Sequence, residues 1–151
     1  MLGRWRGTEH VSRWWGGGTE PGPDDLHDPR TAMWIVAVNG SPFAFMQDYD
    51  VHGWDDHHFA ALPPGSRGID QFIGRADMLG RGHGPAFIRQ RVDALFRDGV
   101  PVVATDPHPD NHRAIAAYRK AGFHVAGEPR GTAWGPVLPM HIRPSPSAGH
   151  R

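Results

Sequence analysis

The segment from Gly68 to Phe123 constrains the fold of this chain more than any other. Its apolar periodicity and glycine positions predict, in order, a strand, a glycine-rich loop, a helix, a strand, a polar loop and a second helix: Arg67–Ile73, 79–82, Gly82–Arg97, Val100–Thr105, 106–109 and Asp110–Ala121. Strands joined through a helix are expected to be parallel neighbours. The segment therefore predicts an α/β (α+β) layered domain.

The flanking segments predict antiparallel strands. Asn39-Gly40 is a strong hairpin signal between a buried-type strand, Ala32–Val38, and a returning strand, Pro42–Val51. A helix is expected over Met1–Trp15, a long polar loop over His52–Ser66, and a closing strand pair in Phe123–Ala126 and Val137–Ile142. The sheet is therefore expected to be mixed, with residues 1–143 forming one domain and 144–151 a disordered tail.

Composition narrows the possible partners. Sixteen basic and sixteen acidic residues balance, so neither nucleic acid nor an acidic membrane is an expected partner. No apolar run approaches the roughly 18 residues that span a bilayer. Cysteine is absent, which excludes disulfides and Cys-ligated zinc and is compatible with a reducing, cytoplasmic location.

Three glycines, Gly80, Gly82 and Gly84, lie where a helix is predicted to begin. Free backbone N–H groups and the helix dipole at such a start attract phosphate, although a tight turn explains the glycines equally well. No Lys-Ser/Thr follows, as a Walker loop requires, and the spacing does not fit a dinucleotide-binding loop.

The loop after Thr105 is a second candidate binding element, because ligands favour the carboxyl ends of strands. Either Asp110 or Asn111 can cap the following helix, with Asp110 favoured, and Asn111 could instead use its amide to bind a ligand. Tyr118 follows about two turns into the helix, where it is either a core residue or a phenol directed into a cleft.

Acidic side chains outnumber basic ones between Asp48 and Asp70. This stretch holds five acidic residues and one basic residue: Asp48, Asp50, Asp55, Asp56 and Asp70, with Arg67. Such a negative balance attracts polyamines, although an ordinary solvated loop is the alternative. Trp15, Tyr49 and Trp54 are candidate walls for a sugar, whereas Trp14 is expected in the core. His52, His57 and His58 match no standard metal spacing, so no metal is expected and a pH-sensitive loop is favoured.

The runs RGIDQFIGRADMLGRGHG and TDPHPDNHRAIAAYRKAGF, with VSRWWGG and VNGSPFAFMQDY upstream, resemble the GNAT N-acetyltransferases, and more narrowly their aminoglycoside 6'-N-acetyltransferase branch. The resemblance covers residues 11–142. It implies a GNAT fold, a mixed twisted sheet flanked by helices, with acetyl-CoA as cosubstrate between the central parallel strands.

The resemblance also implies roles for individual residues. Backbone amides at 81–84 would bind pyrophosphate, the strand edge at 70–73 would pair with pantetheine, and Tyr118 would protonate the leaving thiolate. The complete set implied for acetyl-CoA is Gln71, Phe72, Ile73, Leu79, Arg81, Gly82, His83, Gly84, Asn111, Ala114 and Tyr118.

On the acceptor side, the resemblance assigns Asp70 and Asp106 to the amine, with Trp15, Tyr49, Asp55 and Asp56 around them. The ordinary pKa of an Asp, about 3.9, makes Asp70 a poor base unless its surroundings raise that pKa. A role in aiming the amine is therefore favoured. No covalent enzyme intermediate is expected.

Two features depart from the family pattern. Only ten residues precede Val11, so the first strand is expected to be missing, which opens a sheet edge through which two copies could form a homodimer. Ala133-Trp134 replace an expected Asp before Gly135-Pro136. The missing strand leaves open a truncated, non-catalytic acyl-CoA-binding protein as one alternative. The other alternative is a siderophore-type N-acyltransferase acting on a lysine-like amine with a longer acyl donor, whose relatives usually carry a His where this chain has Asp70.

Overall fold

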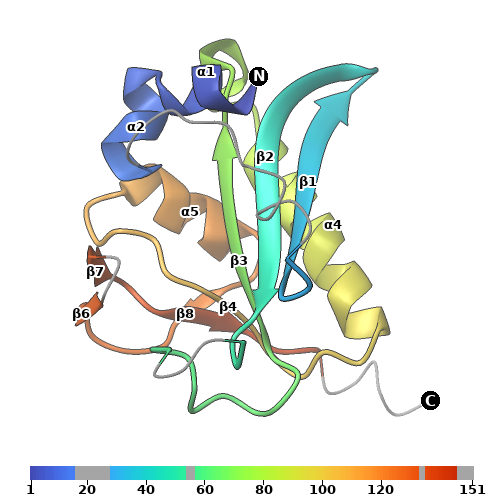
Figure 1. The fold of residues 1–151 in the computed structure, drawn as a ribbon, viewed down its shortest axis with the longest axis vertical. Helices are drawn as coiled ribbons and strands as arrows, with labels where there is room; N and C mark the ends of the chain where they lie inside the picture. The colour runs from blue at the N-terminus through green and yellow to red at the C-terminus, as the bar shows by residue number, and fades with distance from the viewer. Residues whose placement is uncertain (16–27, 54–56, 133–134, 146–151) are drawn as a thin grey trace.

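The computed structural model describes residues 1–15, 28–53, 57–132 and 135–145. Within them a six-stranded sheet runs in the order β1-β2-β3-β4-β8-β5, beside a small β6-β7 pair. The strands are β1 (Thr31–Val38), β2 (Ser41–Asp50), β3 (Arg67–Ile73), β4 (Val103–Thr105), β5 (His124–Val125), β6 (Arg130–Thr132), β7 (Gly135–Val137) and β8 (Met140–Ile142). The helices are α1 (Leu2–Arg6), α2 (Glu9–Trp15), the 3-10 turn η1 (Ala76–Met78), α4 (His83–Arg97) and α5 (His112–Lys120) (Figure 1).

The predicted mixed sheet is confirmed. β3 is antiparallel to β2 and parallel to β4, and β8 is antiparallel to both β4 and β5. The parallel ladder joins only two residue pairs, Arg67↔Val103 and Gly68↔Ala104. β3 continues to Ile73 while β4 ends at Thr105, so the two central strands diverge beyond this point.

The first hairpin is confirmed, but the burial predicted for its first strand is wrong. Asn39 and Gly40 adopt φ values of 51° and 80°, which fit the two-residue turn that this dipeptide favours. β1 is an edge strand, however, and Trp34 and Ile35 are each 42% exposed. An apolar run alone could not separate a central strand from an edge strand. Pairing of two copies through β1 stays a prediction.

Helices pack against both faces of the sheet. On one face, Ile88, Val92 and other apolar residues of α4 contact Met46 and Ile69. On the opposite face, Trp5 and Val11 cover Phe45 and Phe72. The N-terminal segment forms two short helices rather than the one predicted, because the chain turns at Gly7 and the Thr8 hydroxyl donates to the Trp5 carbonyl oxygen (2.6 Å).

A buried ion cluster joins the sheet to α4. The fully buried Asp48 accepts hydrogen bonds from Arg67 (2.8 Å), Arg91 (2.8 Å) and the indole N–H of Trp34 (3.1 Å). Burial opposes ionisation, but Arg91 and Arg67 hold the pKa of Asp48 below its usual value. Asp48 therefore does not belong to the cation-attracting surface expected from the sequence, because its charge is already neutralised inside the fold.

The predicted closing pair is confirmed in part, with His124 opposite His141 and Val125 opposite Met140. The strand predicted over Val137–Ile142 is not continuous, because Val137 ends β7, which pairs with β6, and β8 begins at Met140. Most of the predicted tail, residues 146–151, lies outside the described residues. Among the described residues, none of the helices has the length and apolar character needed to cross a membrane.

Candidate active site

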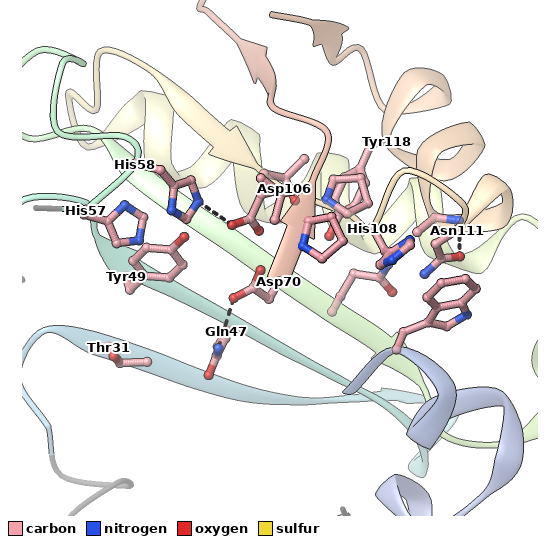
Figure 2. A pocket seen from close by; sticks show the side chains of 17 residues that line it. Thr31, Gln47, Tyr49, His57, His58, Asp70, Asp106, His108, Asn111 and Tyr118 are labelled. Atoms are coloured by element: carbon pink, nitrogen blue, oxygen red, sulfur yellow. Dashed lines mark hydrogen bonds and ion pairs between the residues drawn. The ribbon is translucent and has the colours of Figure 1, made fainter. Parts of the chain in front are cut away.

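A cavity of about 610 Å³ opens where β3 and β4 diverge (Figure 2). Its walls come from both sides of the sheet and from the loops above it: Trp14, Thr31, Gln47, Tyr49, His57, His58, Asp70, Gln71, Thr105, Asp106, Pro107, His108, Asn111, Ala114, Tyr118, Pro136 and Val137. A concave site at the carboxyl ends of central strands is where α/β proteins usually bind ligands.

The far end of β3 presents backbone groups to this opening. Arg67 donates its N–H across to the Val102 carbonyl (3.1 Å), so alternate residues after it, including Gln71 and Ile73, direct their backbone groups to the β4 side. Within the described residues, no strand pairs with this stretch on the β4 side. The Ile73 carbonyl is contacted by the His10 imidazole (2.9 Å). Phe72, expected at the same edge, instead turns its backbone toward β2 and packs with Trp5.

The glycine loop leads directly into α4. Gly80 and Gly82 have φ values of 72° and 80°, a region that a side chain would strain, and Gly82 is the N-cap of α4. It supplies no side-chain cap, so the first N–H groups of α4 are available to an anion. Around this loop Arg81 is exposed, Leu79 half-buried and Gly84 buried, while the His83 ring contacts Phe43 (5.1 Å).

Asn111, not Asp110, caps α5. Its Oδ1 accepts a hydrogen bond from the Ala114 N–H (3.2 Å), whereas Asp110 is exposed and its backbone N–H donates to His108 Nδ1 (3.0 Å). The prediction for Asp110 was wrong because either neighbour could occupy the N-cap. Capping uses the amide oxygen of Asn111, and the residue also lines the cavity.

Tyr118 fits both explanations that the sequence left open. Its ring is buried against Phe123 with centroids 5.3 Å apart, and its side chain lines the cavity between the diverging strands. Burial, and then the charge of Asp70, raises the pKa of the Tyr118 phenol. The phenol therefore remains protonated and can donate.

Asp70 and Asp106 form a carboxyl pair at the centre of the cavity. Burial raises the pKa of Asp70 to about 8, with a further increase from Asp106 and a decrease from Gln47, whose amide donates to Asp70 Oδ2 (3.1 Å). Burial likewise raises the pKa of Asp106 to about 7. The condition that the sequence set for Asp70 as a base is therefore met in the fold, since such a pair can bind a proton near neutral pH.

Tyr49 and Trp14 form aromatic walls of the cavity. The Tyr49 ring lies across Gly68, its partner on β3, at a point where any Cβ would overlap the ring. Trp14, expected in the core, is half-buried and contacts His108 instead (5.1 Å between ring centroids). The side chain of Trp15, together with Trp54, Asp55, Asp56, Ala133 and Trp134, lies outside the described residues.

Sequence reasoning missed two polar groups beside the carboxyl pair. Gln47 was detectable, because it is two residues from Tyr49 on the same strand and so shares its face. His58 was not, because a long loop brings its Nε2 to within 2.6 Å of Asp106 Oδ2.

The pH-sensitive loop expected from the sequence is not supported at His57 or His58, because burial lowers the pKa of both imidazoles, that of His57 to about 4. Among the described residues, no group of three or more acidic or imidazole side chains could hold a metal.

Comparisons with known proteins agree with this geometry. Residues 1–130 match the family model of the acetyltransferase (GNAT) domain. The aminoglycoside N(6')-acetyltransferase type 1 of Klebsiella pneumoniae is 37% identical over 139 residues, or 84% of this chain and 69% of that protein. A kanamycin resistance protein of Rhizobium radiobacter is 49% identical over 65 residues, or 42% of this chain and 60% of that protein. A solved structure of AAC(6')-Ib with ribostamycin and coenzyme A superposes with a TM-score of 0.87 at 33% identity, covering 100% of this chain and 90% of that one.

Proposed function

The chain belongs to the GNAT acetyltransferase family, and from this premise we propose that it acetylates a primary amine of an aminoglycoside, the 6'-amino group, using acetyl-CoA. The observation that carries the proposal is the Asp70–Asp106 pair, which faces Tyr118 across a cavity at the edge of β3 where no described strand pairs with it. Relatives named as aminoglycoside N(6')-acetyltransferases support the choice of acceptor.

The donor side fits acetyl-CoA, which supplies an activated acetyl thioester. The N–H groups at the start of α4, around Arg81 and Gly82, would bind its pyrophosphate, with Leu79, His83 and Gly84 beside them. The backbone of Gln71 and the N–H of Ile73, whose carbonyl is already contacted by His10, would pair with the pantetheine arm like a further strand. Asn111 and Ala114 would border the same arm from α5.

The acceptor side fits a cationic amine. Asp70 and Asp106 concentrate negative charge at the cavity centre, where an ammonium group restores the ionisation that burial opposes. Tyr49 and Trp14 offer the aromatic surface on which a sugar ring can lie. The acceptor roles of Trp15, Asp55 and Asp56 remain expectations from the family resemblance.

Transfer forms one C–N bond and breaks one C–S bond. The ammonium nitrogen gives up two protons in total, of which one ends on the departing sulfur and one is released. Asp70, paired with Asp106, would take the first proton and leave a neutral amine to attack the acetyl carbon. Tyr118, held in its protonated form, would donate its phenolic proton to the sulfur. The second proton lost by the amine nitrogen would then return to the Tyr118 oxygen, through the carboxyl pair or through water.

Thiol release from acetyl-CoA tests the proposal, with kanamycin and tobramycin as acceptors and Asp70→Asn and Tyr118→Phe as variants. We expect turnover with at least one aminoglycoside and its loss in Asp70→Asn. Turnover only with a lysine-like amine and a longer acyl-CoA would favour the siderophore-type alternative. Coenzyme A binding without any turnover would favour the non-catalytic one.

A further inference from the structure

His58 ends a line of polar side chains that crosses the cavity (Figure 2). The line starts at Gln47 on β2, passes through Asp70 on β3 and Asp106 beyond β4, and reaches the loop that carries His58. Four segments distant in the sequence therefore meet through one set of polar contacts. Neither the family match nor the names of the relatives assign a role to His58.

The imidazole of His58 is held in place on several sides. Its side chain is 4% exposed, its ring stacks on His57 (centroids 4.2 Å apart, planes at 22°), and it contacts Phe59 (4.5 Å). His57 is itself fixed, because its Nδ1 accepts the backbone N–H of Phe59 (3.1 Å). The short contact between His58 and Asp106 is therefore built into the packing of the loop.

The direction of this hydrogen bond follows from chemistry. An ionised carboxylate can only accept, so Nε2 of His58 carries the hydrogen when Asp106 is ionised. The charged and titratable groups that face the ring are Asp106, Asp70 and Arg130, with His57 stacked on it. Burial, and then Arg130, lowers the pKa of His58, so the donor is a neutral imidazole.

We propose that His58 is a positioning residue of the acceptor site, which donates its Nε2 hydrogen to Asp106 and so holds that carboxyl toward Asp70 in the form that can accept the proton of the incoming amine. This role rests on the proposed amine acetylation. In each turnover the amine gives one proton to the carboxyl pair and the pair returns it to solvent, so no other reactant is needed.

The effect of removing the donor has a definite sign. Without His58 the ionised form of Asp106 loses a charge-assisted hydrogen bond, whereas its protonated form loses only a weaker, neutral one. Both titration steps of the coupled pair therefore move to higher pH. A purely structural contribution of His58 would lower activity equally at every pH.

The kinetic test compares His58→Phe, which keeps the ring packing, with His58→Gln, which keeps an amide donor. The matched control is His124→Phe, on the exposed β5 strand. In His58→Phe we expect kcat/KM with kanamycin to fall about ten-fold near pH 6.5 and to recover at higher pH. In His58→Gln the acidic limb of the kcat/KM profile against pH should return toward its wild-type position. A loss that is the same at all pH values, or a limb that does not move, would overturn the inference.

A measurement without substrate separates this inference from the proposed function. Carbon-13 NMR of labelled Asp carboxyls should show the Asp70 and Asp106 midpoints moving upward in His58→Phe and not in the control. Shifted midpoints without aminoglycoside turnover would support the effect of His58 on the carboxyl pair and reject the proposed function. Turnover with unchanged midpoints would support the proposed function and reject the role of His58. Should His58→Phe not fold, nitrogen-15 NMR of the wild-type protein decides: Nε2 of His58 must carry the hydrogen above about pH 8, where the carboxyl pair is ionised, and an unprotonated Nε2 there contradicts the proposal.

Discussion

Gln47 on β2 and Asp70 on β3 are cross-strand partners, and the Gln47 amide donates a 3.1 Å hydrogen bond to Asp70 Oδ2. This bond stabilises the carboxylate and lowers its pKa, against the larger effects of burial and Asp106, which raise it. The strand register therefore places a tuning group directly beside the expected base.

Replacing Gln47 with Leu should move the acidic limb of the kcat/KM profile to higher pH, because the ionised form of Asp70 loses its donor. Near pH 6.5 we expect a loss of about five- to ten-fold, with recovery above pH 8. Gln90→Leu, on the exposed face of α4, is the matched control. A limb that stays in place would show that Gln47 does not act through Asp70.

The contribution of the Asp70–Asp106 pair to the stability of the ligand-free protein should fall as pH rises from about 4 to about 8. The unfolded chain releases the Asp70 and Asp106 protons near pH 4, whereas the folded chain retains them until about pH 7 and 8. Asp70→Asn removes one charge that the fold disfavours, so it should raise the unfolding free energy by about 1–3 kcal/mol at pH 8 and little at pH 4. Urea denaturation at both pH values checks this, and equal effects at the two would contradict it.

Tyr118→Phe should lower kcat about 100-fold while leaving the KM for acetyl-CoA within a few-fold. The variant keeps the ring packed on Phe123, so the unfolding free energy should change by only about 1 kcal/mol. Steady-state kinetics and a thermal melt separate the two effects. An unchanged kcat would remove Tyr118 from the proton donation proposed above.

Asp48→Ala should destabilise the fold by about 3–5 kcal/mol, because it leaves Arg67 and Arg91 beside a buried site without their carboxylate. Asp93→Ala is the control: it breaks an exposed ion pair with Arg89 and should cost about 0.5 kcal/mol. Urea denaturation measures both. Similar losses in the two variants would argue against a structural role for the buried cluster.

Gly68→Ala should raise the KM for the aminoglycoside far more than that for acetyl-CoA. The added methyl group would overlap the Tyr49 ring, so this part of the cavity wall must shift, at a cost of about 1–3 kcal/mol in stability. Gly131→Ala, whose added Cβ meets no atom within 4 Å, provides the comparison. Equal changes in both KM values would place the effect outside the acceptor wall.

The sequence predicted the parts of the fold that depend on local pattern. The period of α4, the turn at Asn39-Gly40 and the strand Arg67–Ile73 all follow from neighbouring residues and were confirmed. The exposure of β1 could not be predicted in this way, because an apolar run reads the same in a central and in an edge strand.

The candidate site likewise contains residues that the sequence could identify and features that only the folded structure shows. Asp70, Asp106 and Tyr118 were assigned to the site through the family resemblance, and the structure places all three around one cavity. The raised pKa values and the His58 contact depend on burial and on a loop closing over the strands, which no local pattern encodes. Asp48 shows the reverse error: counted as surface charge, it is a buried counterion of two arginines.

Alternate residues of strand β2 point to opposite faces of the sheet and so serve either the cavity or the fold. Gln47 and Tyr49 line the cavity, while Asp48 between them anchors α4 from the other face. In a library of single variants, substitutions at 47 should therefore be recovered by selecting for abundant folded protein and depleted when selecting for catalysis, whereas those at the buried Asp48 should fail both. Inserting one residue in this strand would exchange the two kinds of position at once, so loops, not β2, are where the chain can accept length changes.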